Sequence, residues 1–172
     1  MDWKKYRESV GYTQAKMSKD ATAWRRLADG YNRAAELLEQ QADRMPGDTR
    51  PFAFIAALSL EQILKAILAR KGVSIPTGPK GHELLLLAEL AMVPLSDNQK
   101  KTLDLFTATL IWAGRYPAPN SASKWDEYQD FTFEQHVIRT PNAAMANRDT
   151  FPDWPNYSKI WVACTAAYDD GV

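Results

Sequence analysis

Apolar residues return every three or four positions in several stretches of this chain, which is the spacing of an amphipathic helix. The first stretch runs from about Asp20 to Arg44, with Trp24 and Leu27 on its apolar face. Pro46 and Gly47 follow it, and this pair is a strong stop signal for a helix. The pattern predicts a long amphipathic helix at the start of the folded part of the chain.

The next stretch, RPFAFIAALSLEQILKAILARK, runs from about Arg50 to Lys71 and is apolar around more than half of its circumference. Pro51 suits the first turn, where its missing N–H costs nothing, and Gly72 ends the pattern. A helix that is apolar on most sides has to be covered on most sides. We therefore expect this helix to be the central one of the core.

Three further helices are predicted downstream. Gly81 can cap the third, which would place His82 in its first turn, and Ser96 or Asp97 can cap the fourth. Cys164 falls on the apolar side of the last helix, where a lone cysteine indicates a small buried hydrophobe. The three predicted ranges are 82–91, 98–114 and 156–169.

The stretch from Arg115 to about Pro155 differs in composition, with five of the ten prolines and many Asn, Ser and Asp residues. We expect a loop there, apart from a short helical turn at FTFEQHV, and loops of this length often carry function. No internal repeat and no strand is predicted. The predicted fold class is an all-α bundle of four to five main helices with a long Pro-rich loop before the last helix. Residues 1–19 form an N-terminal extension and residues 20–172 a single domain.

The net charge favours no one class of partner, because the chain has 21 Lys and Arg residues and 21 Asp and Glu residues. The distribution is uneven, with 16 basic and 12 acidic residues in positions 1–102, and 5 and 9 in positions 103–172. The single cysteine allows no intrachain disulfide. The N-terminus lacks the apolar core of a signal peptide, and no window holds the roughly 18 apolar residues of a spanning helix. We expect a cytoplasmic protein with no membrane partner.

Three motifs follow one another in the central part of the chain: SLEQILKAILARKG, then PTGPKGHELLLLAEL, then WAGRYPAP at the end of the fourth predicted helix. Together they resemble the HEPN domain (higher eukaryotes and prokaryotes nucleotide-binding). That family shows a Glu and a Lys one turn apart, a Gly-His or Thr-His pair opening the next helix, and an Arg-Tyr-Pro near a helix end. The resemblance covers about residues 50–120. It implies a HEPN-like helical bundle, often a homodimer, that acts on or beside RNA or nucleotides in bacterial stress or defence systems, without a cofactor.

Many relatives of this kind are metal-independent RNases of toxin–antitoxin or phage-defence systems. Their signature is an Arg followed, after four to six residues, by a His. After Arg115 that His would stand at position 120, 121 or 122, where this chain has Asn120, Ser121 and Ala122. The resemblance therefore implies a member without the RNase signature, with a partner protein of the antitoxin or nucleotidyltransferase type.

Arg115 is the first candidate site residue. Pro117 pushes Tyr116 out of the α region, so the chain turns here. A cation at a helix C-terminus is stabilising by about 0.3–1 kcal/mol, which by itself would explain Arg115, with Tyr116 packed under the proline loop. In the functional alternative, the guanidinium holds a phosphate through two parallel hydrogen bonds.

The two histidines are the candidates for proton transfer. In the first turn of a helix, His82 is expected to be neutral, because the helix dipole disfavours imidazolium. A neutral His can take a proton from a ribose hydroxyl, or it can anchor a loop to another helix. His136, in FEQHVIRT, would replace the missing signature histidine if that turn folds back, and is otherwise a surface residue of the loop.

Glu61 and Lys65 lie one turn apart on the predicted central helix and share a face. A charged pair among so many apolar residues needs a partner or a cleft, so it either lines the same pocket as Arg115 or reaches the edge of the bundle. With Tyr116 and Asn120 the pair forms the predicted nucleotide- or RNA-binding set. The acids at 126, 127, 130 and 134 lack the spacing of a calcium loop, so no metal site is expected.

Three functions follow from these residues. The first is a HEPN-like RNA- or nucleotide-associated protein that does not cut RNA. The second is a metal-independent endoribonuclease that uses Arg115 with His82 or His136. The third is a helical protein–protein interaction module whose aromatic loop is the contact surface.

Overall fold

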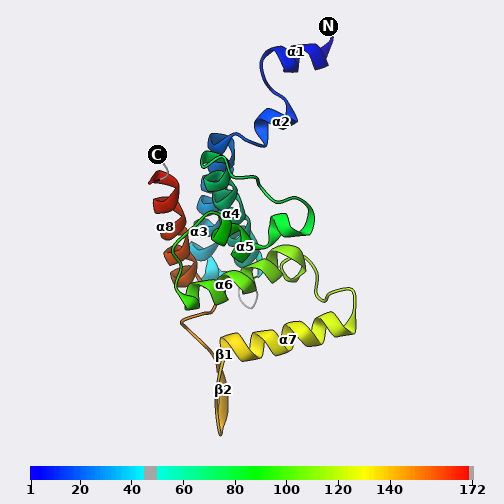
Figure 1. Cartoon of the computed structure of the whole chain (residues 1–172). Coiled ribbons are helices and arrows are strands. Elements are labelled where there is room, and N and C mark those ends of the chain that lie inside the picture. Colours follow the sequence, from blue (N-terminus) through cyan, green and yellow to red (C-terminus); the bar gives the residue numbers. More distant parts are fainter. Residues whose placement is uncertain (45–49, 171–172) are drawn as a thin grey trace.

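The computed structural model describes residues 1–44 and 50–170. Helices α3, α4, α5, α6 and α8 pack into one all-α bundle, which confirms the predicted fold class (Figure 1). The predicted stop signal at Pro46 and Gly47 lies outside the described residues. The helices are α1 (Trp3–Ser9), α2 (Gln14–Met17), α3 (Ala21–Gln40), α4 (Arg50–Arg70), α5 (Leu84–Leu90), α6 (Asp97–Ala108), α7 (Ala122–His136) and α8 (Trp154–Asp169). The strands are β1 (Val137–Thr140) and β2 (Ala143–Ala146), paired antiparallel with Val137 opposite Ala146.

Helix α4 is the central helix, as predicted. Every residue from Ser59 to Leu68 is buried, because α3, α5, α6 and α8 all contact this helix. By length and composition, α4 is the one helix of residues 1–44 and 50–170 that could cross a membrane, and 78% of its apolar window is buried inside the bundle. Its apolar surface is therefore used to hold the core together.

Helix α3 covers α4 with the predicted apolar face, on which Trp24 and Leu38 pack against the core, except that Leu27 lies outside it. Ala28 and Ala35 are fully buried, whereas Leu27, which the periodicity placed on the apolar face, is half exposed. Asp20 begins the helix by accepting a hydrogen bond from the backbone N–H of Ala23 at 3.0 Å. Small residues at the contact allow the two helices to pack closely, since the distance between helix axes depends on the side chains between them.

Tyr157 on α8 ties three helices together. Its side chain is fully buried, and its hydroxyl donates to Asn32 Oδ1 on α3 at 2.7 Å and lies 2.6 Å from Ser59 Oγ on α4. Further along α8, Ile160 and Cys164 are buried on the predicted side. Burial raises the pKa of the Cys164 thiol to about 12, which keeps it protonated and unreactive at neutral pH.

The predicted absence of strands is wrong, and so is the predicted loop between residues 115 and 155, apart from the helical turn at FTFEQHV, which lies at the end of α7. Helix α7 and the hairpin of β1 and β2 occupy most of this region. Pro119 precedes α7 and Pro141 lies in the two-residue turn of the hairpin, so no proline interrupts the helix. His136 is the one buried residue of α7. A helix that buries so little needs no apolar stripe, so periodicity gave no signal for it. Helix α7 and the hairpin extend from the end of the bundle opposite to α1 and α2 (Figure 1).

We expect Tyr157→Phe to lower the free energy of unfolding by about 1–3 kcal/mol, because it leaves Asn32 and Ser59 without this partner inside the bundle. Urea denaturation followed by circular dichroism measures the loss. Tyr168→Phe is the matched control. No hydrogen bond joins the Tyr168 hydroxyl to the described residues, so its removal should change stability by less than about 0.5 kcal/mol. Equal losses in the two variants would contradict the role given to Tyr157.

Candidate functional site

Helix α6 carries Arg115 at its C-terminal end. Ser96 and Gln99 form a capping box at its start, which confirms Ser96 as the predicted cap. At Thr109–Ala113 the helix widens into a π-helical turn, in which the N–H of Gly114 donates to the carbonyl five residues earlier at 2.9 Å. Such turns are frequent at functional sites. Here the turn determines the position at which Arg115 leaves the helix.

Gly114 allows the end of α6 to lie against α4. A Cβ atom at this position would come within 2.8 Å of the Phe54 side chain. Arg115 follows directly, and its guanidinium donates to the carbonyl of Ile111 and lies 5.4 Å from the ring centre of Tyr116. The predicted cap on the helix end is therefore present. A guanidinium has five N–H donors, so Arg115 can hold this cap and still bind an anion.

Glu61 and Lys65 form an ion pair inside the bundle, with 5% and 9% of their side chains exposed. Lys65 Nζ lies 2.5 Å from Glu61 Oε1, and His82 Nδ1 lies 3.0 Å from Glu61 Oε2. Both oxygens of the carboxylate therefore have a nitrogen partner, as a buried charge requires. The alternative in which this pair reaches the edge of the bundle does not hold for Glu61.

His82 does not lie in the first turn of a helix, and Gly81 is not its cap. It ends a 3-10 turn at Gly78–His82, and α5 begins after the cap residue Glu83. The argument from the helix dipole therefore does not apply. An ionised carboxylate only accepts hydrogen bonds, so a neutral His82 carries its hydrogen on Nδ1 toward Glu61. Its Nε2 is then an acceptor on a side chain that is 52% exposed.

Gly81 allows the 3-10 turn to pack closely beside the segment that precedes it. A Cβ atom there would come within 2.7 Å of the carbonyl oxygen of Pro76, which a side chain could not do without moving the backbone. This close packing is what brings His82 back to the buried carboxylate on α4. The glycine thus has a structural role that differs from the cap predicted for it.

Arg115, His82 and Glu61 line one cavity of about 490 Å³, which we call the Arg115 cavity. Apolar residues from α4 and the π-helical turn, among them Phe54 and Ile111, form most of the remaining wall. The cavity therefore combines a guanidinium, an imidazole and a neutralised carboxylate with an apolar floor. Such an arrangement can bind an anion that has an apolar or aromatic part.

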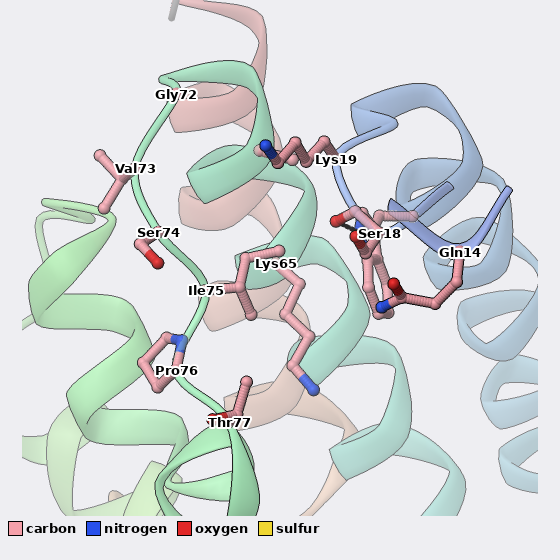
Figure 2. A pocket seen from close by; sticks show the side chains of 12 residues that line it. Gln14, Ser18, Lys19, Lys65, Gly72, Val73, Ser74, Ile75, Pro76 and Thr77 are labelled. Carbon is pink, nitrogen blue, oxygen red and sulfur yellow. Dashed lines mark hydrogen bonds between the residues drawn. The ribbon is translucent and has the colours of Figure 1, made fainter. Parts of the chain in front are cut away.

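Lys65 faces a different cavity, of about 690 Å³, which we call the Lys65 cavity. It lies between α4, residues 72–77 and the N-terminal segment that carries Lys19 (Figure 2). Trp24 forms part of its wall, and the Trp24 ring lies 5.5 Å from Lys65 Nζ. The ion pair between Glu61 and Lys65 is thus a bridge between two cavities.

Tyr116 and Asn120 line a third cavity of about 360 Å³, together with Trp112 and Lys124. Ile111 belongs to the walls of this cavity and of the Arg115 cavity, so the two are neighbours. The predicted binding residues are therefore not gathered at one point. They line a series of adjacent cavities around the end of α6 and the middle of α4.

His136 is a buried anchor, contrary to the prediction of a surface residue. It is 1% exposed, and its Nδ1 lies 3.1 Å from both the carbonyl oxygen and the Oγ1 of Thr150. Its Nε2 is buried and has no hydrogen-bond partner among the described residues. It does not line the Arg115 cavity. The structure therefore gives His136 no place beside Arg115 and makes it a link between α7 and the segment before α8.

The three cavities are also lined by residues that the sequence did not single out as candidate site residues, among them Phe54, Ile111, Lys19, Trp24 and Lys124. They are ordinary helix and loop residues in the sequence, and no spacing connects them to the predicted set. Across residues 1–44 and 50–170, no three His, Cys, Asp or Glu side chains lie close enough together to hold a metal ion.

Comparisons with protein-family models, with curated proteins and with solved structures give no match to this chain. Arg115 can hold an oxyanion, and a neutral His82 oriented by Glu61 can accept a proton.

Lys65→Met should lower the free energy of unfolding by about 3–5 kcal/mol, because it leaves the Glu61 carboxylate buried without its closest counter-charge. Lys100→Met is the matched control. The pair of Lys100 with Asp97 is exposed and 4.0 Å long, so its loss should cost less than about 1 kcal/mol. The double variant Glu61→Leu/Lys65→Met should recover most of the stability, since no charge remains to be neutralised. Urea denaturation measures these losses. Equal losses in the free energy of unfolding for Lys65→Met and Lys100→Met would refute this account.

His136 should make stability depend on pH. Burial lowers the pKa of His136 below its ordinary value of 6.5, with Lys101 adding to the decrease and the bond to Thr150 opposing it. Below about pH 6.5 the unfolded chain takes up a proton that the native chain does not. The contribution of neutral His136 to the free energy of unfolding is therefore complete above about pH 6.5. It is lost as the pH falls toward the lowered pKa of His136.

Urea denaturation at about pH 7 and about pH 5 measures this effect, and His136→Gln should lose less stability between the two than the unaltered chain. Burial raises the pKa of Asp104, and the negative charge of Glu89 raises it further. This shift opposes the effect of His136, because a raised carboxyl pKa adds stability as the pH falls. Asp104 is present in both proteins, so its contribution cancels in the comparison. An equal pH dependence in both would disprove the role given to His136.

Proposed function

We propose that this chain is a HEPN-like, RNA- or nucleotide-binding protein of a bacterial stress or defence system, acting in the cytoplasm, and that a phosphate binds at Arg115. One observation carries the proposal: Arg115, His82 and Glu61 come from three separate segments and line a single cavity. Residues selected for their chemistry in the sequence thus lie together in space.

The charges around the Arg115 cavity favour an anion. Glu61 is the one acidic residue on its wall, and its oxygens are paired with Lys65 and His82. Arg115 and Lys65 together carry two positive charges against the single negative charge of Glu61. A phosphate that enters the cavity therefore meets a cluster of side chains whose net charge is positive. The Glu61 carboxylate is already paired, so Arg115 remains to bind the phosphate.

The surface beside Arg115 suits a base. Tyr116 is 54% exposed and lies beneath the guanidinium, and Trp112 lines the adjacent cavity with Asn120 and Lys124. Exposed aromatic rings stack on nucleic-acid bases without strong sequence preference. Asn120 offers an amide for base or ribose contacts, and Lys124 a further cation for a second phosphate.

Metal-independent RNA cleavage is the second candidate function, and the bond between Glu61 and His82 favours it. Glu61 orients the imidazole so that Nε2 can take the proton of a ribose 2′-hydroxyl, whose oxygen then attacks the phosphorus. Arg115 would stabilise the charge on the phosphate oxygens while the 5′-oxygen leaves. On the described cavity wall, no second acid stands ready to protonate that oxygen, so binding takes precedence over cleavage. His136 is not part of this proposal, because it does not line the cavity.

Protein–protein association is the third candidate. Trp3 and Tyr12 in the N-terminal segment and Phe133 on α7 are exposed aromatic residues, at opposite ends of the molecule (Figure 1). Residues 1–19 hold five basic and two acidic residues, whereas residues 122–136 hold one basic and four acidic ones. These opposite charges fit a homodimer in which the N-terminal segment of one copy meets α7 of the other, or a partner of the antitoxin or nucleotidyltransferase type.

The test uses purified protein, a fluorescently labelled pool of short single-stranded RNA, and a chelator. Arg115→Ala should weaken binding about ten-fold or more, because it removes a charge-assisted contact worth roughly 1.5–3 kcal/mol. The slope of log affinity against log salt should decrease by about 0.7 for each phosphate contact that is lost. Arg33→Ala is the matched control, since Arg33 is exposed on α3 and lines none of the three cavities.

The same samples, separated on a gel, report cleavage. Cleaved RNA that forms with the unaltered protein and does not form with His82→Ala would establish the RNase alternative. Absence of binding to the RNA pool and to AMP or ATP would reject the proposed function. Sedimentation of the same protein would then show whether association is the role that remains.

A further inference from the structure

The Lys65 cavity is a second candidate binding site, separate from the Arg115 cavity. Its volume of about 690 Å³ falls within the range of roughly 300–1,000 Å³ that small-molecule sites occupy. Helix α4, residues 72–77 and the N-terminal segment enclose it on three sides (Figure 2). The indole N–H of Trp24 donates to the carbonyl of Ser18 at 2.9 Å, which fixes the N-terminal segment over the cavity.

Lys65 is the buried charge of this cavity. Its side chain is 9% exposed and extends from α4 into the space between residues 72–77 and the N-terminal segment (Figure 2). An ammonium group can donate three hydrogen bonds. Among residues 1–44 and 50–170, the acceptor of Lys65 Nζ is Glu61 Oε1. Donor capacity therefore remains on a cation that is nine-tenths buried and lines an open space.

The described wall of this cavity has positive charge and no acidic residue. Lys19 supplies a second ammonium group, which points away from that of Lys65 (Figure 2), and Ser74 and Thr77 supply hydroxyl groups. Trp24 and Ile75 supply apolar surface. The chemical complement of such a wall is an oxyanion attached to an apolar or aromatic body.

We propose that the Lys65 cavity binds a small organic oxyanion, a carboxylate or a phosphate ester, with its charged group at Lys65. Its apolar body lies against Trp24 and Ile75. Binding here does not require RNA at the Arg115 cavity. Because Lys65 also bonds to Glu61, an occupant of this cavity shares the cation that neutralises the carboxylate beside His82.

The first measurement uses the full chain and the fluorescent probe 8-anilinonaphthalene-1-sulfonate, which has an oxyanion on an aromatic body. The measurement is made on the unaltered chain and on Arg115→Ala, which removes the cation of the other candidate anion site. In Arg115→Ala we expect saturable binding with one site per chain. Ser74→Trp, which places a bulky ring on the exposed rim, should weaken it about ten-fold. Lys19→Met, which removes the positive charge at the other end of the cavity, should weaken it by a smaller factor. Both changes leave the Glu61–Lys65 pair intact, so neither depends on a variant that fails to fold. Lys16→Met, on an exposed lysine outside the cavity, is the control that should bind the probe as its parent does.

Competition then identifies the oxyanion. Phenyl phosphate and benzoate carry the two candidate groups on the same ring, and benzyl alcohol is a neutral match. Displacement of the probe by either anion at concentrations where benzyl alcohol has no effect supports the proposal and shows which group is preferred. Equal displacement by benzyl alcohol, absence of saturable binding, or binding that Ser74→Trp does not weaken would each overturn it. None of these outcomes bears on RNA binding at Arg115.

Discussion

A carboxylate inside a helical bundle has to be neutralised where it lies, and much of this structure serves that need for Glu61. Lys65, one turn further on α4, supplies the closest counter-charge, and His82 returns from beyond the end of α4 to supply the second partner. The return is possible because Gly81 packs against the backbone of Pro76. A buried ion pair is weak evidence for stability, so its presence in the central helix points toward function.

The same ion pair separates and connects two cavities. On one side, Glu61 and His82 face Arg115, whose position depends on the π-helical turn and on the contact of Gly114 with α4. On the other side, Lys65 faces a wall that has no acidic residue among those described. A ligand in either cavity would act on one end of a shared hydrogen-bonded chain. The proposed RNA or nucleotide site and the proposed oxyanion site therefore share this ion pair.

Much of the fold could be predicted because burial determines the pattern of apolar residues. Helix α4 is buried along most of its length and is apolar around more than half of its circumference, and Ser96 begins α6 as its side chain predicted. Helix α7 was missed because it buries little beyond His136 and so has no apolar stripe. The hairpin was missed because its strands are short and exposed, although Pro141 and Asn142 are suitable residues for its turn.

The sequence by itself determined that the chain is an all-α bundle with α4 at its centre, since helical periodicity and burial are local properties of the chain. It also singled out Arg115, His82, Glu61 and Lys65 as candidate site residues, each with a structural alternative. Only the tertiary structure decided which of them meet. The meeting of Arg115 with His82 depends on how α6 and the 3-10 turn pack against α4, and the exclusion of His136 depends on the direction in which α7 leaves the bundle. Those are long-range contacts, and no spacing along the chain encodes them.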